Sequence, residues 1–201
     1  MDKYLVLVNK KTQFDEDMIK DFQMAQIPVN MSKNKEFVDV TAYEAFKALK
    51  KQLLKKGIVA TVNSAGRTVE EQTEFMNEQI KQLGEKEALE IVAKPGESEH
   101  HLGLCLDVNL DSFKAKIERK INPEKAKDMR NKMYEYMNKI LSDFGFILRY
   151  PKDKEVETGY PFERWHIRYV GVENAKQMED LNMTLEEYVK YIKEQENLIS
   201  L

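Results

Sequence analysis

Apolar and polar positions alternate along the chain in short blocks that predict interspersed strands and helices. Five stretches have the length and apolar composition of strands: residues 4–8, 58–62, 104–110, 146–150 and 166–170. Apolar residues at helical spacing fill much of the sequence between them. The order lacks a clean βαβ repetition, which favours an α+β fold over a doubly wound parallel sheet.

Three Thr-x-x-Glu patterns mark expected helix starts, at Thr41, Thr68 and Thr184. In this spacing the threonine and glutamate side chains each accept a hydrogen bond from the other residue's backbone N–H group, which forms a capping box. The first two helices are expected to end at Gly57 and Gly84, since glycine commonly terminates helices.

A further helix is expected from Asn122-Pro123, because proline suits the first helical position. It should run to Gly145 and present one apolar face made of Met129, Met133, Met137 and Leu141. Methionines at this spacing indicate core packing rather than a cofactor site.

Length and charge limit the number of domains and the classes of protein to which the chain can belong. The 201 residues contain no internal repeat or linker, so one domain over 1–201 is expected. With 32 basic and 35 acidic residues, the chain lacks the basic footprint of nucleic-acid-binding proteins. The one cysteine excludes an intrachain disulfide.

The first apolar run, Tyr4–Val8, is too short for a signal peptide or a membrane span. A cytoplasmic location is therefore expected, the alternative being an extracellular, membrane-anchored parent whose anchor was removed.

The first chemical cluster lies between Ser98 and Asp107. His100 and Asp107 are seven positions apart, and a turn near Gly103 would bring their side chains together. Imidazole and carboxylate are typical ligands of catalytic zinc. The alternative is a polar loop leading into a strand, with Asp107 as a structural hydrogen-bonding group. Cys105 is more typical of a small core residue than of a ligand.

The second cluster is Glu163-Arg164-Trp165-His166. A hydrolytic zinc site needs three protein ligands, an open position and a nearby base. His166 would complete a ligand set with the first cluster, and Glu163 would be the base. The alternative places Trp165 in the core and pairs Glu163 with Arg164 or Arg168.

The third cluster, Ser64–Gln72, joins the end of a predicted strand to a capped helix. Such a junction can aim Arg67 into a cleft, where a guanidinium suits a substrate carboxylate or a developing oxyanion. The alternative is an exposed arginine near a helix start.

Together the three clusters resemble the zinc D-alanyl-D-alanine peptidases of the VanY, VanX and VanXY group. S-E-H-H-L-G-L-C-L-D at 98–107 resembles the motif S-x-H-x-x-G-x-A-x-D, and E-R-W-H at 163–166 resembles E-x-W-H. S-A-G-R-T-V-E-E-Q at 64–72 resembles S-G-[YF]-R-S-x-x-E-Q. The resemblance covers about residues 58–193, whereas residues 1–57 match loosely.

The resemblance implies an α+β fold in which helices flank a central antiparallel sheet. It also implies roles for seven residues: His100, Asp107 and His166 as Zn²⁺ ligands, Glu163 as catalytic base, Arg67 as the arginine that stabilises substrate and transition state, and Gln72 and Ser98 as substrate-binding residues. Three positions depart from the family pattern. Cys105 replaces Ala, Arg164 replaces Pro, and Ala65-Gly66 replaces Gly-aromatic, which removes a ring beside Arg67.

The implied activity is hydrolysis of the terminal D-Ala bond of peptidoglycan stem peptides or precursors. D,D-carboxypeptidase activity is expected, together with the D,D-dipeptidase activity of the cytoplasmic VanXY type. The same motifs also fit an L,D-carboxypeptidase or an endopeptidase. An alternative from another class is a non-catalytic zinc-binding recognition module.

Overall fold

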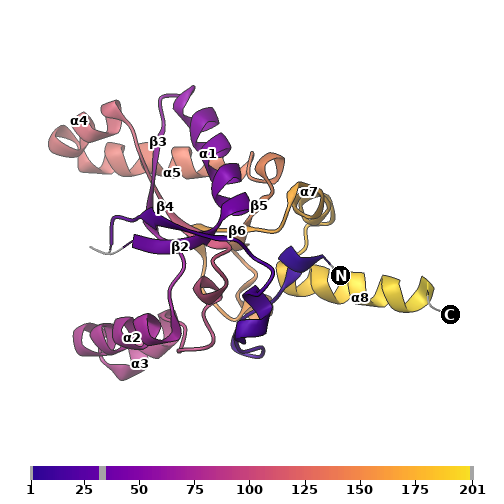
Figure 1. Ribbon diagram of the computed structural model, residues 1–201. Helices are drawn as coiled ribbons and strands as arrows, with labels where there is room; N and C mark the ends of the chain where they lie inside the picture. Colours follow the sequence, from indigo (N-terminus) through magenta and orange to yellow (C-terminus); the bar gives the residue numbers. More distant parts are fainter. Residues whose placement is uncertain (1, 32–34, 200–201) are drawn as a thin grey trace.

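A four-stranded antiparallel sheet in the order β3-β4-β6-β5 forms the centre of the structure (Figure 1). Its strands are β3 (Val59–Ser64), β4 (Cys105–Asp111), β5 (Phe146–Tyr150) and β6 (Glu163–Tyr169). A separate antiparallel pair consists of β1 (Met24–Pro28) and β2 (Lys35–Asp39). This computed structural model describes residues 2–31 and 35–199.

Eight helices surround the strands in the described part of the chain. They are α1 (Val40–Leu54), α2 (Val69–Leu83), α3 (Glu85–Ile91), α4 (Phe113–Ile121), α5 (Pro123–Asn138), α6 (Glu155–Thr158), α7 (Val172–Leu181) and α8 (Leu185–Ile199). Four short 3₁₀ segments are η1 (Lys3–Leu5), η2 (Glu16–Ile19), η3 (Glu99–Leu102) and η4 (Ser142–Phe144). Figure 1 shows α1, α4 and α5 above the sheet and the α2–α3 pair below it.

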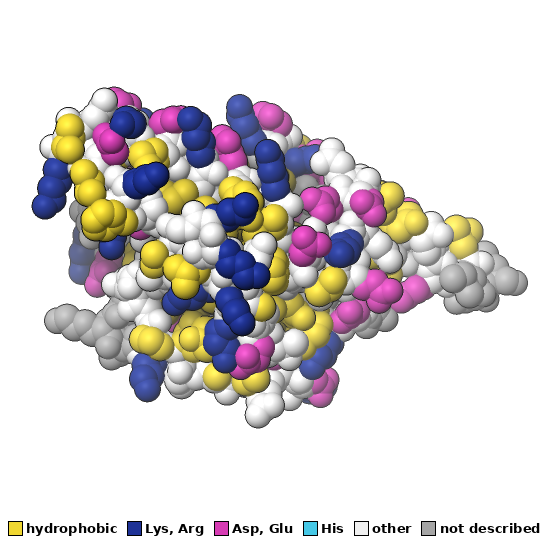
Figure 2. Space-filling model, turned by 90° about the horizontal axis from the view of Figure 1, so that it is seen from above, with side chains coloured by type: hydrophobic (Ala, Val, Ile, Leu, Met, Phe, Trp, Pro, Cys, Tyr) yellow, Lys and Arg dark blue, Asp and Glu magenta, His cyan; other side chains and the backbone are white. Residues whose placement is uncertain are grey.

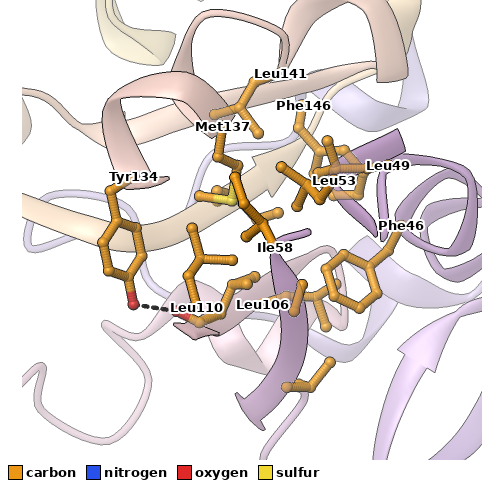
Figure 3. Packing of buried hydrophobic residues seen from close by; sticks show 14 of the residues in the cluster. Phe46, Leu49, Leu53, Ile58, Leu106, Leu110, Tyr134, Met137, Leu141 and Phe146 are labelled. Atoms are coloured by element: carbon orange, nitrogen blue, oxygen red, sulfur yellow. Dashed lines mark hydrogen bonds between the residues drawn. The ribbon is translucent and has the colours of Figure 1, made fainter. Parts of the chain in front are cut away.

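The alternation of β4 separates the core from the candidate site, because successive side chains of a strand point to opposite faces. Leu106, Val108 and Leu110 are fully buried in the main core, against residues of α1 and α5 such as Phe46 and Met137 (Figure 3). Cys105, Asp107 and Asn109 alternate with them and lie on the opposite face. One strand therefore supplies both the core and the site.

Most sequence predictions of secondary structure are confirmed. The α+β architecture is present, and strands occur at 58–62, 104–110, 146–150 and 166–170 with ends shifted by a few residues. The Thr68 capping box opens α2, and Gly84 follows its last residue. Thr184 caps α8, since its Oγ accepts a hydrogen bond from the Glu187 N–H at 3.2 Å. Met133, Met137 and Leu141 are buried in the core as predicted.

The predicted strand at 4–8 is wrong. Lys3–Leu5 form the 3₁₀ segment η1, and residues 6–8 are irregular. The Tyr4 and Val6 carbonyls accept hydrogen bonds at 3.1 and 2.7 Å from Arg168, so a buried guanidinium takes the place of a neighbouring strand. The apolar residues Leu5 and Val8 are nevertheless buried, which explains the misleading pattern.

Three helix boundaries also differ from prediction, and one of them is the end of the first helix, which lies at Leu54 rather than Gly57. The first helix begins at Val40, and its N-cap is Asp39 rather than Thr41, because the Asp39 Oδ1 accepts the Ala42 N–H at 3.0 Å. The helix that begins at Pro123 ends at Asn138, and a 3₁₀ segment precedes Gly145. Among the described residues, no helix is both long and apolar enough to cross a bilayer.

Surface charges of both signs are interspersed. Figure 2 shows lysines and arginines scattered among acidic side chains over the face seen from above. No histidine appears on that face, and all three histidines are buried, with exposed fractions of 1–4%. Imidazole chemistry is therefore confined to the interior.

We expect Asp39→Ala to lower the free energy of unfolding by about 1 kcal/mol, since the replacement leaves an N–H group at the start of α1 without its side-chain acceptor. The matched control is Thr41→Ala at the exposed position that the sequence pattern favoured as cap. This control should change stability by less than about 0.5 kcal/mol. Urea unfolding of both variants measures the difference, and a larger loss for Thr41→Ala would contradict the assignment.

Candidate metal centre

A pocket of about 490 Å³ lies between the sheet and the α2–α3 pair. All seven residues that the sequence singled out for chemistry line it: Arg67, Gln72, Ser98, His100, Asp107, Glu163 and His166. They come from segments far apart along the chain, and the fold brings them to one place.

The turn predicted near Gly103 brings His100 to Asp107. His100 lies in η3, Gly103 follows in the left-handed conformation with φ of 63°, and β4 begins two residues later. The His100 Nε2 lies 3.5 Å from the Asp107 Oδ2. The other ring nitrogen, Nδ1, hydrogen-bonds the Ala65 carbonyl, which leaves the lone pair on Nε2.

Strand pairing brings His166 to the same carboxylate. His166 on β6 lies directly opposite Asp107 on β4, and its Nδ1 is 3.0 Å from the Asp107 Oδ1. The His166 Nε2 lies 2.8 Å from the Glu99 Oε1 and donates its proton there. The lone pair of His166 is therefore on Nδ1, which faces Asp107.

These atoms fit a shared metal ion. The Asp107 Oδ1 is buried and has no partner in hydrogen-bond geometry, although the His166 Nδ1 is only 3.0 Å away. Two lone-pair-bearing atoms at this distance are satisfied when both bind one cation. Each histidine also has its second nitrogen fixed by an acceptor, which is the usual arrangement around metal-binding imidazoles.

Glu163 lies at the edge of this group, with its Oε2 3.6 Å from the His166 Nδ1. Burial raises the pKa of the Glu163 carboxyl, and the nearby His166 offsets this only in part. Burial acts on Asp107 in the same direction, but His100 and His166 outweigh it and hold that pKa well below its usual range. The two carboxyl groups therefore differ in basicity, so Glu163 is the better proton acceptor.

Cys105 offers an alternative ligand. Sγ and one nitrogen each of His100 and His166 lie within 4.8 Å of one another, and the same holds for Asp107, Glu163 and His166. Cys105 is fully buried, and the described lining of the pocket includes Asp107 but not Cys105. A metal that must keep a position open to substrate is therefore better served by Asp107.

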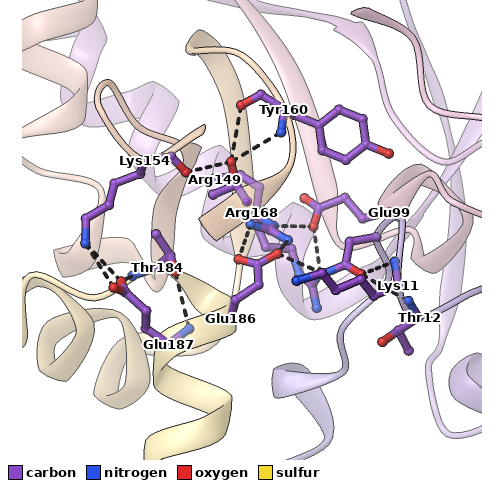
Figure 4. Close-up of polar contacts among 12 residues, drawn as sticks. Lys11, Thr12, Glu99, Arg149, Lys154, Tyr160, Arg168, Thr184, Glu186 and Glu187 are labelled. Carbon is purple, nitrogen blue, oxygen red and sulfur yellow. Dashed lines mark hydrogen bonds and ion pairs between the residues drawn. The ribbon is translucent and has the colours of Figure 1, made fainter. Parts of the chain in front are cut away.

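Behind His166, a buried ionic network fixes its orientation, and Figure 4 shows its members Glu99, Arg149, Arg168 and Glu186. The fully buried Glu99 carboxylate accepts hydrogen bonds from His166, from the Arg149 Nε at 2.7 Å and from the Arg168 Nη1 at 3.1 Å. Burial would raise the pKa of Glu99, but Arg149 and Arg168 outweigh it and lower that pKa far below its usual range. Glu99 is thus a permanent anion that accepts the His166 proton.

The network continues to the last helix. Arg149 donates two further hydrogen bonds, from Nη1 and Nη2, to the Glu186 carboxylate on α8 at 2.9 and 2.6 Å. Both arginines have fully buried side chains, so each charge needs a partner. The position of His166 therefore depends on α8 as well as on the sheet.

Arg67 follows β3 in a turn held by two contacts. The Glu36 carboxylate accepts hydrogen bonds from the Ser64 hydroxyl at 3.0 Å and the Ala65 N–H at 2.5 Å. Gly66 packs against β2, where a Cβ would lie 2.4 Å from Phe37 atoms, so only glycine fits. The family pattern has an aromatic ring at position 66, beside the arginine. Here Phe75 of α2 supplies a ring instead, since its centroid lies 4.7 Å from the Arg67 guanidinium carbon.

His101 supports the same turn and stands apart from the metal group. Its Nδ1 lies 2.8 Å from the Arg67 carbonyl, and its Nε2 accepts the Gly96 N–H at 3.1 Å. Burial lowers the pKa of His101, which favours the neutral tautomer that these two contacts require. Of the two adjacent histidines, only His100 faces Asp107.

Two alternatives from the sequence are wrong. Trp165 is not in the core: it is 40% exposed and lines the pocket, because β6 begins at the pocket's edge. Glu163 does not pair with Arg164 or Arg168 in the described structure. Arg168 bonds Glu99, and Arg164 hydrogen-bonds Asn131, while Glu163 faces His166.

Sequence reasoning missed Glu99, Arg149 and Arg168. A signal was present, since each arginine interrupts an otherwise apolar or aromatic strand, FILRY and HIRYV. A charged residue within a buried strand requires a buried counter-ion. The sequence could not show that Glu99 is this counter-ion, because its partners lie 50 and 69 residues away.

The sequence model of the VanY family, described as D-alanyl-D-alanine carboxypeptidase, matches residues 35–172. A D-alanyl-D-alanine carboxypeptidase of Enterococcus faecalis is 32% identical over 194 residues, which cover 92% of this chain and 65% of that protein. The chain spans between 56% and 65% of the length of four curated relatives that it matches.

Two solved structures share the fold over nearly their whole length. A variant of the vancomycin resistance D,D-pentapeptidase VanY from a VanB-type cassette, in complex with Zn(II), has a TM-score of 0.75 and 30% identity and covers 94% of this chain and 99% of that one. VanYB in complex with D-alanine-D-alanine has a TM-score of 0.74 and 31% identity, with 93% and 97% covered.

Glu99→Gln should lower the free energy of unfolding by about 3 kcal/mol, because it leaves the buried Arg149 and Arg168 without their shared anion. Glu97→Gln is the matched control two residues away, where the described contacts use the backbone N–H and carbonyl groups, which bond Lys94 and Tyr160. Chemical denaturation measures both. Equal effects of the two substitutions would show that Glu99 does not hold the network.

Proposed function

Since this chain belongs to the VanY family of D-alanyl-D-alanine carboxypeptidases, we propose that it is a zinc-dependent peptidase acting on the terminal D-Ala bond of peptidoglycan stem peptides or their precursors. The observation that carries the proposal is the convergence of His100, Asp107 and His166 beside Glu163 in one pocket. A metal bound by a VanY relative and D-alanine-D-alanine bound by VanYB support the cofactor and the substrate class.

The proposed ligands of Zn²⁺ are the His100 Nε2, an Asp107 carboxylate oxygen and the His166 Nδ1. Two neutral imidazoles and one carboxylate are typical donors for catalytic zinc. When bound, zinc supplies an acidic water at neutral pH and polarises a carbonyl group. All three proposed ligands and Glu163 line the pocket, so a peptide bound there can reach the metal group.

Glu163 is proposed as the general base. Its pKa is raised by burial, so the carboxylate takes a proton from the attacking water more readily than Asp107 does. The protonated Glu163 then gives this proton to the amine of the departing D-Ala. The distance of 3.6 Å between its Oε2 and the His166 Nδ1 supports this role.

Arg67, Gln72 and Ser98 are proposed to hold the peptide. The Arg67 Nε is buried without a partner, which leaves a donor for the terminal carboxylate or for the oxygen that gains charge. Gln72 is fixed because its Nε2 donates to the Ala93 carbonyl at 2.7 Å, while its buried Oε1 has no partner. Ser98 caps η3 and lines the pocket beside His100.

Product analysis distinguishes the activities that share this site. The purified chain with stoichiometric zinc is incubated with D-Ala-D-Ala, with acyl-L-Lys-D-Ala-D-Ala and with a tetrapeptide that ends in one D-Ala. We expect cleavage of the tripeptide, and cleavage of the dipeptide as well would indicate the VanXY type. Cleavage of the tetrapeptide alone would indicate an L,D-carboxypeptidase. Cleavage of none of the three, with zinc bound, would favour a recognition module.

Glu163→Gln should retain one zinc per chain and lose hydrolysis by a factor of about 10²–10⁴, because the amide cannot accept the water proton. His166→Ala is the matched comparison and should lose zinc. Metal content and peptide hydrolysis are measured for both proteins. Near-normal activity of Glu163→Gln would remove the proposed base.

Cys105→Ala should keep stoichiometric zinc and measurable hydrolysis, since the pocket-facing ligand is Asp107 and alanine fits the buried position on β4. Asp107→Ala should instead lose zinc. Metal content after dialysis against a weak chelator compares the two. Loss of zinc from Cys105→Ala would show that the His100, Cys105 and His166 group holds the metal.

A further inference from the structure

The pocket contains more arginines than the proposed hydrolysis uses. Three arginines line it, Arg67, Arg130 and Arg164, and the proposed function employs only Arg67. Arg67 enters from the turn after β3, whereas Arg130 comes from α5 and Arg164 from the start of β6. The two further arginines therefore line the pocket from other elements than Arg67.

Arg130 is held in place but not neutralised. Its Nη2 donates to the Asn109 side-chain oxygen at 2.9 Å, and its Nε is buried without a hydrogen-bond partner. Asn109 is two residues from Asp107 on the same face of β4, which corresponds to about 7 Å along the strand. The anchor of Arg130 is thus a short distance from the proposed ligand set.

Arg164 is held in the same way by neutral groups of α5. Its Nη1 donates to the Asn131 side-chain oxygen, and its guanidinium carbon lies 5.1 Å from the Tyr134 ring centroid. Across residues 2–31 and 35–199, neither Arg130 nor Arg164 forms an ion pair. Arg164 occupies the second position of the E-x-W-H motif, where the family pattern usually has proline.

None of the carboxylates that line the described pocket pairs with Arg130 or Arg164. Glu99 bonds Arg149 and Arg168, and both Asp107 and Glu163 face His166. Two fixed guanidinium groups that line one pocket and form no ion pair with its carboxylates favour binding of a carboxylate from the ligand. The reason is that a planar guanidinium bonds a carboxylate through two parallel N–H groups.

We infer that Arg130 and Arg164 form a subsite for a carboxylate on the side chain of the residue that precedes the D-Ala-D-Ala end. This inference rests on the proposed function and names its substrate class. An extended peptide advances by about 3.3–3.6 Å per residue, so the anchor of Arg130 is about two residues from the reacting group. Arg67 serves the terminal end, which leaves the acyl part of the peptide for these two arginines.

Two matched peptides test the subsite. In acetyl-X-D-Ala-D-Ala, X is L-lysine or meso-diaminopimelate, which differs from lysine by one carboxylate at the end of its side chain. For the zinc-loaded protein we expect kcat/KM to be at least about 10-fold higher for the diaminopimelate peptide, as a charge-assisted hydrogen bond warrants. In Arg130→Gln/Arg164→Gln the ratio should fall to about 1–2. Arg119→Gln, an exposed arginine already paired with Asp111 at 3.0 Å, should keep the ratio.

Calorimetric binding of both peptides to Glu163→Gln gives a second measurement that does not depend on turnover. A wild-type ratio near 1 would overturn the subsite while leaving the proposed function intact. Equal losses on both peptides in the double variant would overturn it too, because they would place the arginines on the shared terminal carboxylate. If neither peptide is hydrolysed, the proposed function fails. The calorimetric preference for diaminopimelate, or its absence, still decides the subsite.

Discussion

The structure around the pocket depends on one buried anion. Glu99 has no solvent-exposed surface on its side chain, and it joins His166 to two arginines whose side chains are equally buried. A buried charge without a partner is costly, so the two arginines, His166 and the carboxylate must assemble together. Arg168 also bonds the backbone of the N-terminal segment, and Arg149 bonds α8. The N-terminal segment is thereby bonded to β6, which carries His166, and α8 to the neighbouring strand β5.

Strand pairing provides the second constraint, since it determines which atoms meet. The register of β4 and β6 sets Asp107 opposite His166, and alternation directs the neighbouring Leu106 and Ile167 into the core. A shift of one residue would exchange the core face and the site face. The hydrophobic core therefore fixes the geometry of the polar site on the other side of the same sheet.

The sequence predicted most of the elements and seven of the pocket-lining residues, because these follow from local patterns or motif spacing. Thr68 and Gly84 mark α2 by chemistry that needs no distant partner. Residues 4–8 failed for the opposite reason, since their carbonyls bond Arg168, more than 160 residues away. The motifs likewise identified His100 and His166, whereas the role of Glu99 depends on contacts with β5 and β6. The partners of a long-range ion pair have no fixed separation along the chain, so a single sequence does not show which residues pair.

The link between Arg149 and Glu186 bears on where the functional unit ends. The family match stops at residue 172, yet the carboxylate that bonds Arg149 lies on α8 (Leu185–Ile199), as Figure 4 shows. A fragment trimmed to the family boundary would keep every proposed ligand and still expose one side of a buried guanidinium. Domain limits drawn from sequence similarity thus understate the cooperative unit, which extends to the helix that neutralises the charge behind the metal group.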